Sequence, residues 1–393
     1  MIVFFSNFIN EHQIPLCEAL YKKTDGEFCF VATEAIWEER VKLGFQDQSS
    51  KYQYVLKSYE SQENYNKACS LANEAEIVIL GDAPLCFVEE RLKAGKITFK
   101  YSERFFKKGK IRMLDPRVLR GRYKQDIRFR HAPFYLLCAG AYVAEDARAI
   151  LSYPNKMYKW GYFPAVHHVE DVDKYIEQKR KNTILWVGRF IDWKHPELPV
   201  KIAKSLKDDG LDFRMELVGN GQMLEDVKKL IDKYDLNDRV YVLGAMPPEQ
   251  VREKMGTSEI FIFTSDRNEG WGVVLNEAMN AGCAIVASHA IGSVPFLVEN
   301  GKNGLIYRDG NDKEAVDCVK RLLNNAEMRK EIGKSAYLTI VEHWNAENAA
   351  EQLIELVNSL MKNEHNVKKI ESGVCSKADR LKRNWFKTKK ETE

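Results

Sequence analysis

The sequence predicts an α/β fold made of two doubly wound, Rossmann-like domains. Short β-rich runs alternate with helical patterns along the chain. The runs are continuously apolar, as expected of parallel strands that helices cover on both faces. About six such runs fall in each half, which is too many for one sheet and favours two. The chain has 393 residues, 45% of them hydrophobic, which is enough for two cores.

The elements follow in order along the chain. In the first half we predict strands at 2–6, 28–33, 52–56, 76–81, 97–103 and 134–140, with helices at 14–23, 64–75 and 86–95. In the second half we predict strands at 183–189, 215–220, 239–245, 259–265, 284–289 and 304–310, with amphipathic helices such as 222–235 between them.

The polar stretch 167–182 marks the domain boundary, and the last elements, 326–344 and 345–363, are wholly helical. The residues that follow are polar and basic. We therefore expect an N-terminal domain of residues 1–166, a C-terminal domain of residues 167–345, a helix at 346–363 and a basic tail at 364–393.

Composition excludes several classes of protein. Acids and bases nearly cancel, with a formal net charge of +3, so bulk charge does not indicate nucleic-acid binding. The eight cysteines contain no CxxC pair and the eight histidines have no metal-ligand spacing, which predicts free thiols and no metal site. No apolar segment approaches the length of about 18 residues that spans a membrane. The N-terminus lacks the basic region of a signal peptide. We expect a soluble, cytoplasmic protein.

The stretch 268–282, NEGWGVVLNEAMNAG, contains two glutamates, Glu269 and Glu277, in a glycine-rich segment. It follows a predicted strand, so Glu269 is expected in a strand-to-helix loop, where Gly270 and Gly272 let the backbone approach a ligand. A helix then starts near Gly272, and Glu277 lies about two turns further on among apolar residues. A carboxylate there is costly to bury unless it accepts strong hydrogen bonds, for example from a sugar diol. Taken alone, a solvated Glu277 is an equally good interpretation.

A second loop, WVGRFIDWKHPEL at 186–198, also follows a predicted strand. After Gly188 it presents Arg189 and Lys194, before a helix that Pro196 can open. The guanidinium fork matches two phosphate oxygens and the ammonium adds a point charge, so the loop suits a diphosphate. Ordinary surface charge is the alternative. A third loop, with Gly219 and Gly221, is a weak signal because it lacks the full GxGxxG pattern.

These motifs resemble a known family. The series VGRFIDWK, LVGNGQ, NEGWGVVLNEAMNAGCAIVAS and NGLIYRDGN is similar to the C-terminal half of the family-4 (group 1) retaining glycosyltransferases, which have the GT-B fold. The E-x(7)-E signature of that family is here Glu269 to Glu277. The resemblance is strong from about residue 183 to residue 344 and weaker in the first half. It implies two domains facing across a cleft, with the last helix returning to the N-terminal domain.

The resemblance also implies roles for the matching residues. Arg189 and Lys194 would bind the diphosphate of a nucleotide-sugar donor and stabilise the departing nucleoside diphosphate. Glu269 would contact the donor sugar, and Glu277 the ribose. The other donor-binding positions would be Gly188, Gly219, Gly221, Ala245, Met246, Gly270, Trp271, Gly272 and Val273. The family generally works without a metal, so no cofactor besides the donor substrate is expected.

The chain departs from the family pattern in three places. His195 follows the lysine where members often have glycine, and Phe296 stands where many carry glutamate. The first loop, SNFINEHQIP, lacks the glycines that often approach the donor phosphates. These differences leave the identity of the donor and the contacts of the N-terminal domain open.

The N-terminal domain is expected to hold the acceptor. A loose alignment offers Glu103 and Arg104 in the loop after the strand 97–103, and His12 in the first loop is a comparable candidate. For each of them, a polar surface loop is the alternative interpretation.

Two segments indicate that the protein binds a membrane surface or a lipid-linked acceptor. The stretch 91–131 is densely basic with interleaved aromatic residues, and the tail carries Trp385 and Phe386 among basic residues. Both favour an anionic membrane surface or a lipid-diphosphate acceptor, and a solvated face with a disordered tail is the alternative. On this basis, deletion of the chain after Asn363 is expected to leave folding intact and to reduce membrane binding. No module for RNA binding is recognisable.

The leading hypothesis is a retaining, metal-independent glycosyltransferase of the hexosyltransferase type. It would move a sugar from a nucleotide-diphosphate-sugar to a glycan or polyprenyl-linked glycan in bacterial surface polysaccharide synthesis, at the inner face of the plasma membrane. A sugar-nucleotide epimerase of similar fold and a non-catalytic nucleotide-sugar-binding subunit are the alternatives. A phosphorylase would need a cofactor-binding lysine, of which there is no sign.

Overall fold

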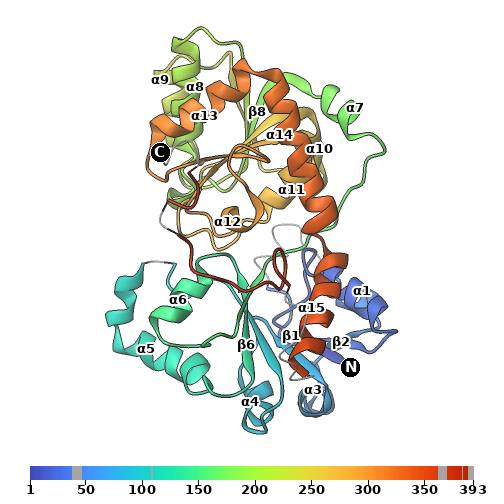
Figure 1. The fold of residues 1–393 in the computed structure, drawn as a ribbon. Helices are drawn as coiled ribbons and strands as arrows, with labels where there is room; N and C mark the ends of the chain where they lie inside the picture. Colours follow the sequence, from blue (N-terminus) through green and yellow to red (C-terminus); the bar gives the residue numbers. More distant parts are fainter. Residues whose placement is uncertain (38–46, 108, 362–369, 383, 388–393) are drawn as a thin grey trace. The chain divides into compact units, whose positions relative to one another are not determined.

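The computed structural model describes residues 1–37, 47–107, 109–361, 370–382 and 384–387. Its chain divides into two units. Unit 1 comprises Met1–Ala165 and Trp344–Arg380, and unit 2 comprises Val166–His343 and the C-terminal residues from Leu381 on. Each unit contains one parallel sheet with helices around it (Figure 1). The predicted fold class, α/β with two Rossmann-like domains, is confirmed.

Unit 1 is built on a seven-stranded parallel sheet with the order β3-β2-β1-β4-β5-β6-β7. Its strands are β1 (Ile2–Ser6), β2 (Phe28–Ala32), β3 (Val55–Lys57), β4 (Ile77–Leu80), β5 (Thr98–Ser102), β6 (Phe134–Ala139) and β7 (Met157–Trp160). Its helices are α1 (Ile14–Lys23), η1 (Ser49–Lys51), α3 (Gln62–Glu74), α4 (Cys86–Lys93), η2 (Lys110–Leu114), α5 (Pro116–Arg122), η3 (Tyr123–Ile127), α6 (Val143–Ala149) and α15 (Ala346–Met361). The central strands are buried on both faces, which explains their continuous apolar runs.

The last helix, α15, belongs to unit 1 and packs against α1. The family resemblance implies this return to the N-terminal domain. The apolar stripe of α15 buries Ala349, Ala350 and Leu353. This stripe, at helical spacing, is what allows a C-terminal helix to complete an N-terminal core.

The tail is part of the fold of unit 1. The backbone of Cys375 donates to Lys159 O at 2.9 Å, and Lys159 N donates to Ser376 O at 2.8 Å, so this segment pairs antiparallel with the edge strand β7. Val374, Cys375 and Ala378 are buried. From these contacts we expect, unlike from the sequence alone, that removing the chain after Asn363 would destabilise unit 1, because it would expose both an apolar cluster and a strand edge.

Unit 2 is built on a six-stranded parallel sheet with the order β10-β9-β8-β11-β12-β13. Its strands are β8 (Arg180–Val187), β9 (Arg214–Val218), β10 (Val240–Gly244), β11 (Ser258–Phe263), β12 (Ala284–Ser288) and β13 (Leu305–Tyr307). Its helices are α7 (Val172–Glu177), η4 (Asp192–Lys194), α8 (Glu197–Asp208), α9 (Leu224–Lys233), α10 (Pro248–Thr257), α11 (Val274–Asn280), α12 (Val294–Leu297), α13 (Asp312–Asn324), α14 (Ala326–Leu338) and η5 (Thr339–His343). All six strands predicted in this half are present.

In both sheets the strand order reverses beside the first strand, between β1 and β4 in unit 1 and between β8 and β11 in unit 2. At such a switch point the loops after the two strands diverge to opposite faces, which leaves room for a ligand at the carboxyl edge. Among the described helices, none combines the length and apolar character needed to cross a bilayer.

Candidate functional site

The loops after β8 and β11 meet at the switch point of unit 2. The Thr264 hydroxyl donates to the backbone oxygen of Lys194 at 2.6 Å, and the Asp266 N–H donates to the oxygen of Trp193 at 3.0 Å. The buried indole of Trp186 donates to Thr264 Oγ1 at 2.8 Å. These bonds fix the two loops against each other and so determine where their side chains can lie.

Lys194 and Glu269, which the sequence analysis singles out separately, form an ion pair through Nζ and Oε2. The Ser265 hydroxyl donates to the same carboxylate oxygen at 3.0 Å. Glu269 is only 8% exposed, so its charge depends on these partners. Ser265 lies two residues after the end of β11, and a hydroxyl just beyond a strand is the only signal that could have predicted it.

Arg189 joins this pair through Trp193. The Arg189 guanidinium is exposed and lies 5.6 Å from the centroid of the Trp193 ring, and Lys194 Nζ lies 4.7 Å from the same centroid. An aromatic face attracts cations, so one ring holds both charges in the same loop. The sequence analysis did not include Trp193, although it stands between the two cations in the sequence.

The predicted glycines bring the neighbouring loops close together. The Gly188 N–H donates to Val218 O at 3.0 Å, and the Gly219 N–H donates to Gly244 O at 2.8 Å. Gly219 has φ +137°, and a Cβ there would lie 1.9 Å from Gly188 O. At Gly221 a Cβ would lie 2.4 Å from Phe190 O. These positions exclude side chains because of loop packing, and any contact of theirs with a donor stays a prediction.

The other residues predicted to bind the donor lie at α11 and after β10. Because this helix begins at Val274, Glu277 lies in its first turn, half-buried, rather than deep within it. Trp271 is buried and its indole donates to Asn276 Oδ1 at 2.8 Å. Gly272 has φ +82° and packs on Phe263. After β10, Ala245 is exposed and Met246 is half-buried. The role of these two residues in donor binding stays a prediction.

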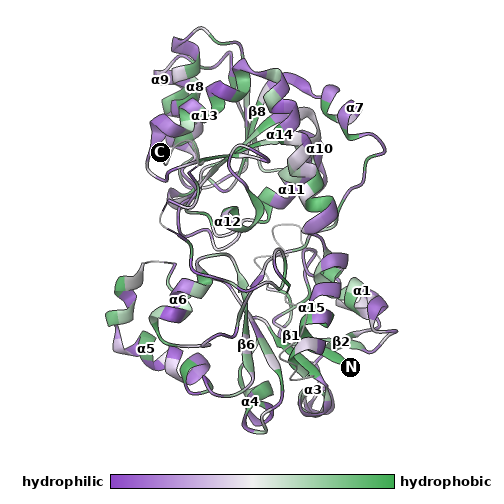
Figure 2. Cartoon of the chain, in the orientation of Figure 1, coloured by the Kyte–Doolittle hydropathy of each residue, from purple (hydrophilic) through white to green (hydrophobic). Residues whose placement is uncertain are grey.

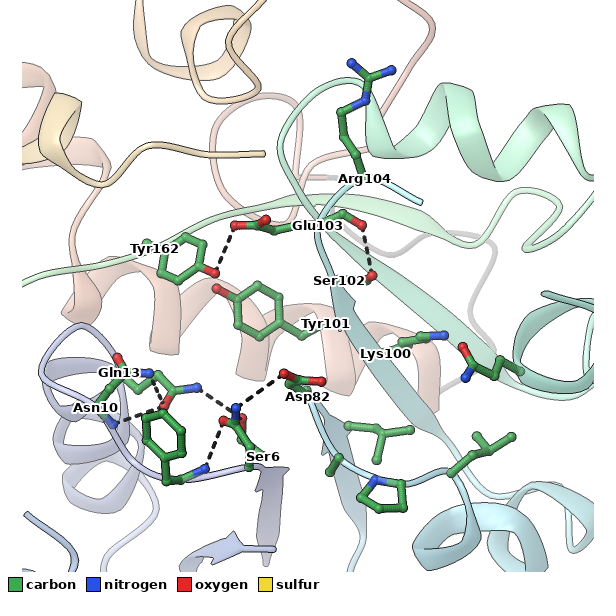
Figure 3. Close-up of a pocket in the computed structure, with 18 of the residues that line it drawn as sticks. Ser6, Asn10, Gln13, Asp82, Lys100, Tyr101, Ser102, Glu103, Arg104 and Tyr162 are labelled. Carbon is green, nitrogen blue, oxygen red and sulfur yellow. Dashed lines mark hydrogen bonds between the residues drawn. The ribbon is translucent and has the colours of Figure 1, made fainter. Parts of the chain in front are cut away.

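Unit 1 has its own pocket, of about 530 Å³, at the carboxyl ends of β1, β4 and β5 (Figure 3). Asn7, after β1, donates to Asp82 Oδ2 at 3.3 Å, and this bond crosses the switch point from β1 to β4. Asn7 accepts in turn from the backbone N–H of Phe8 at 2.9 Å. Asp82 directly follows Gly81 at the end of a predicted strand, a signal that the sequence analysis did not use.

Glu103 and Arg104 both line this pocket, as Figure 3 shows. The Tyr162 hydroxyl donates to Glu103 Oε1 at 3.1 Å, and Lys107 pairs with Oε2. Burial, together with the Glu103 charge, raises the pKa of Tyr162, so this hydroxyl keeps its proton. Arg104 lies 3.4 Å from Asp146. His12 is in the loop before α1 and is not among the described residues that line the pocket.

The described lining of the pocket contains two carboxylates, Asp82 and Glu103, and four cations: Lys100, Arg104, Lys107 and Arg122. Each cation is paired with a carboxylate: Lys100 and Arg122 with Asp126, Arg104 with Asp146, and Lys107 with Glu103. Among the described residues, no cluster of metal-ligating side chains was found in either unit.

Comparison with known proteins connects these loops to a family. Residues 169–339 match the family of glycosyl transferases, group 1. Unit 2 is a group 1 glycosyl transferase domain. The match confirms the resemblance drawn from the four motifs.

Two curated proteins are similar in sequence to this glycosyl transferase domain. An uncharacterised glycosyltransferase of Methanocaldococcus jannaschii is 31% identical over 195 residues, which cover 48% of each chain. The alpha-D-kanosaminyltransferase of Streptomyces kanamyceticus is 30% identical over 170 residues, 43% of this chain and 44% of its own. The chain thus matches less than half the length of either relative.

Among solved structures, the Anabaena protein HepE in complex with UDP has a TM-score of 0.64 and 14% identity, over 91% of this chain and 99% of that chain. This likeness extends the shared fold over both units.

Proposed function

We propose that the protein is a retaining glycosyltransferase that moves a sugar from a nucleotide-diphosphate-sugar to a glycan acceptor. The observation that carries the proposal is the meeting of Arg189, Lys194 and the buried Glu269 at the switch point of a group 1 glycosyl transferase domain. Its relative from Streptomyces kanamyceticus is named as a sugar transferase, and the Anabaena neighbour binds UDP.

In the proposed reaction the bond between the anomeric carbon and the diphosphate oxygen breaks, and a bond to an acceptor hydroxyl oxygen forms on the same face of the sugar. The hydroxyl proton passes to the departing diphosphate oxygen. Negative charge then accumulates on the nucleoside diphosphate. The guanidinium of Arg189 and the ammonium of Lys194 neutralise it, so the protein itself supplies the charge that a metal supplies elsewhere. Glu269 accepts hydrogen bonds from the sugar hydroxyls and Glu277 from the ribose.

The acceptor is proposed to bind in the pocket of unit 1. Asp82, Glu103 and Tyr162 offer groups that can exchange hydrogen bonds with sugar hydroxyls. Arg104 and Lys107, which line the same pocket, are proposed to bind the phosphate of an acceptor such as a polyprenyl-linked glycan.

The test is turnover of UDP-, GDP- and ADP-sugars with labelled sugar groups. We expect slow transfer of sugar to water from one donor, with retained configuration in the first product seen by NMR. Arg189→Ala should lower this rate by about 10²–10³-fold, the usual effect of losing one stabilising donor. The matched control is Lys201→Ala. Lys201 lies on α8 and forms an exposed ion pair with Asp312 of α13 at 2.8 Å. Equal rates for the two variants would contradict the role of Arg189.

Lys194→Ala needs a separate measure of folding, because it also leaves the buried Glu269 without its ammonium partner. The products distinguish the alternatives. Inversion at sugar C2 would indicate an epimerase, and donor binding without turnover would indicate a binding subunit.

A further inference from the structure

The helical segment 110–127 of unit 1, which comprises η2, α5 and η3, exposes large apolar side chains. Ile111 is 75% exposed, Leu114 79%, Leu119 38% and Tyr123 57%. Leaving four such side chains in water within so short a segment is unfavourable, which indicates that another surface covers them.

The spacing of these side chains groups them into two stripes. Ile111 and Leu114 are three residues apart in a 3₁₀-helix, whose side chains eclipse at that interval. Leu119 and Tyr123 are four residues apart along α5 and the start of η3, and so lie on one face. In Figure 2 hydrophobic and hydrophilic residues alternate along this part of unit 1.

Basic residues are interleaved with the two stripes. Residues 107–124 contain eight lysines and arginines and one acid, Asp115. That acid caps α5 by accepting from the backbone of Arg117 at 2.9 Å. Arg112, Arg117, Arg120 and Lys124 are exposed. The segment is therefore both apolar and strongly cationic on its surface.

A buried anchor fixes the segment to the sheet. Asp126 is fully buried, and its carboxylate accepts from Lys100 Nζ at 2.5 Å and from the Tyr153 hydroxyl at 2.7 Å. Arg122 Nη1 lies 3.1 Å from its other oxygen. Arg122 and Lys107 also line the pocket of unit 1, so the segment and the pocket share a wall.

We propose that the segment 110–127 docks unit 1 on an anionic membrane. Interleaved cations and apolar side chains match such a surface, where phosphates lie above the acyl chains. Docking there would bring the pocket wall formed by Lys107 and Arg122 to the level of the lipid headgroups.

One of the two tail aromatic residues expected at a membrane surface, Phe386, packs within the protein instead. The Phe386 side chain is only 8% exposed, and its ring lies 4.7 Å from that of His289 in unit 2. Its backbone oxygen accepts from Asn300 Nδ2 at 2.8 Å. This aromatic side chain is therefore occupied within the protein.

The test is co-sedimentation of the full chain with vesicles of phosphatidylcholine, with and without phosphatidylglycerol. We expect binding only to the anionic vesicles, weakened by salt. Ile111→Ser combined with Leu114→Ser should weaken it by at least about tenfold. Arg117→Ala combined with Arg120→Ala should also weaken it. The matched control is Leu151→Asn, because Leu151 is 68% exposed elsewhere on unit 1.

Three results would overturn the proposal: equal binding to neutral and anionic vesicles, no binding to either, or unchanged binding by the Ile111/Leu114 variant. Donor turnover in solution needs no vesicles. A negative result in the vesicle experiment would therefore not contradict the proposed function, and absence of donor turnover would not contradict membrane docking.

Discussion

His195 has φ +50°, in the left-handed region that glycine adopts most easily. The family that the sequence resembles is expected to have glycine at this point, and the turn directly after Lys194 does need a positive φ. Here the imidazole forms a contact instead, with Nδ1 3.2 Å from Glu197 Oε1. The chain keeps the turn and adds a titratable side chain beside the site.

This contact predicts a pH-dependent stability. The hydrogen bond to Glu197 raises the pKa of His195 in the folded protein, with burial opposing. The protonated imidazole therefore stabilises the fold fully below its ordinary pKa of about 6.5, and this stabilisation is lost as pH rises through the raised value. His195→Asn, which tolerates the same φ, should lose this dependence. The side chain is 34% exposed, so we expect a difference under about 1 kcal/mol.

Urea unfolding of both proteins at pH 5.5 and pH 8.5 measures this difference. A gap between the wild type and His195→Asn that is the same at both pH values would contradict the role of the His195–Glu197 bond.

Asp126 is a second residue whose effect can be predicted. It is a fully buried acid beside Lys100, and burial lowers the pKa of that lysine while Asp126 opposes the shift. Asp126→Ala would leave Lys100 buried without its carboxylate, at a cost of about 3–5 kcal/mol in unfolding free energy. Asp173→Ala, which removes an exposed pair with Lys334 at 2.6 Å, is the control and should cost under about 1 kcal/mol. Similar losses for both would mean that Asp126 is not an anchor.

At the scale of elements, the sequence predicts central strands better than edge strands. Each strand of unit 2 contains a run of apolar residues, which in β9 is interrupted by Glu216, a buried acid paired with Arg214 and Lys254. β7 was not predicted because it is a four-residue edge strand with Lys159 in its middle. Its partner, the segment around Cys375, was assigned to a free tail because it is short and lies among polar residues.

The strand pairing of the tail is testable by a single substitution. Val374 is 1% exposed, so Val374→Asp would bury a charge without a partner and destabilise unit 1 by about 3 kcal/mol or more. Lys382→Asp, at an exposed position of the same tail, should change stability by less than about 0.5 kcal/mol. Denaturant unfolding compares the two variants. Equal stability would show that the tail does not support the sheet.

At the scale of the whole molecule, the loops that follow strands could be predicted, but their contacts could not. Arg189, Lys194 and Glu269 were found because each follows an apolar run. Their convergence depends on the strand order, which places β8 beside β11 although four helices and two strands separate them in sequence. In unit 1 the alignment found Glu103 and missed Asn7 and Asp82. These two residues are far apart in sequence and come together only because β1 and β4 are neighbours in the sheet, which no sequence spacing indicates.

Ligand binding should be visible in the melting of the whole chain. The preferred nucleoside diphosphate at about 100 times its dissociation constant would stabilise the folded state by about 2.7 kcal/mol. Calorimetry with UDP, GDP and ADP should therefore identify one base by its shift. We expect Arg189→Ala to lose most of this shift and Lys201→Ala to keep it. Equal shifts with all three nucleotides would mean that the base is not recognised.

The ion pair of Lys194 and Glu269 has a consequence for the order of recognition. A diphosphate that binds Lys194 competes with the Glu269 carboxylate for the same ammonium. If the diphosphate displaces the carboxylate, the buried Glu269 needs new hydrogen-bond donors. Sugar hydroxyls are such donors. An intact nucleotide-sugar gives both Lys194 and Glu269 a partner at once. A nucleotide without its sugar pairs with Lys194 and leaves Glu269 without its ammonium. The domain should thus discriminate substrate from spent product through a single shared contact.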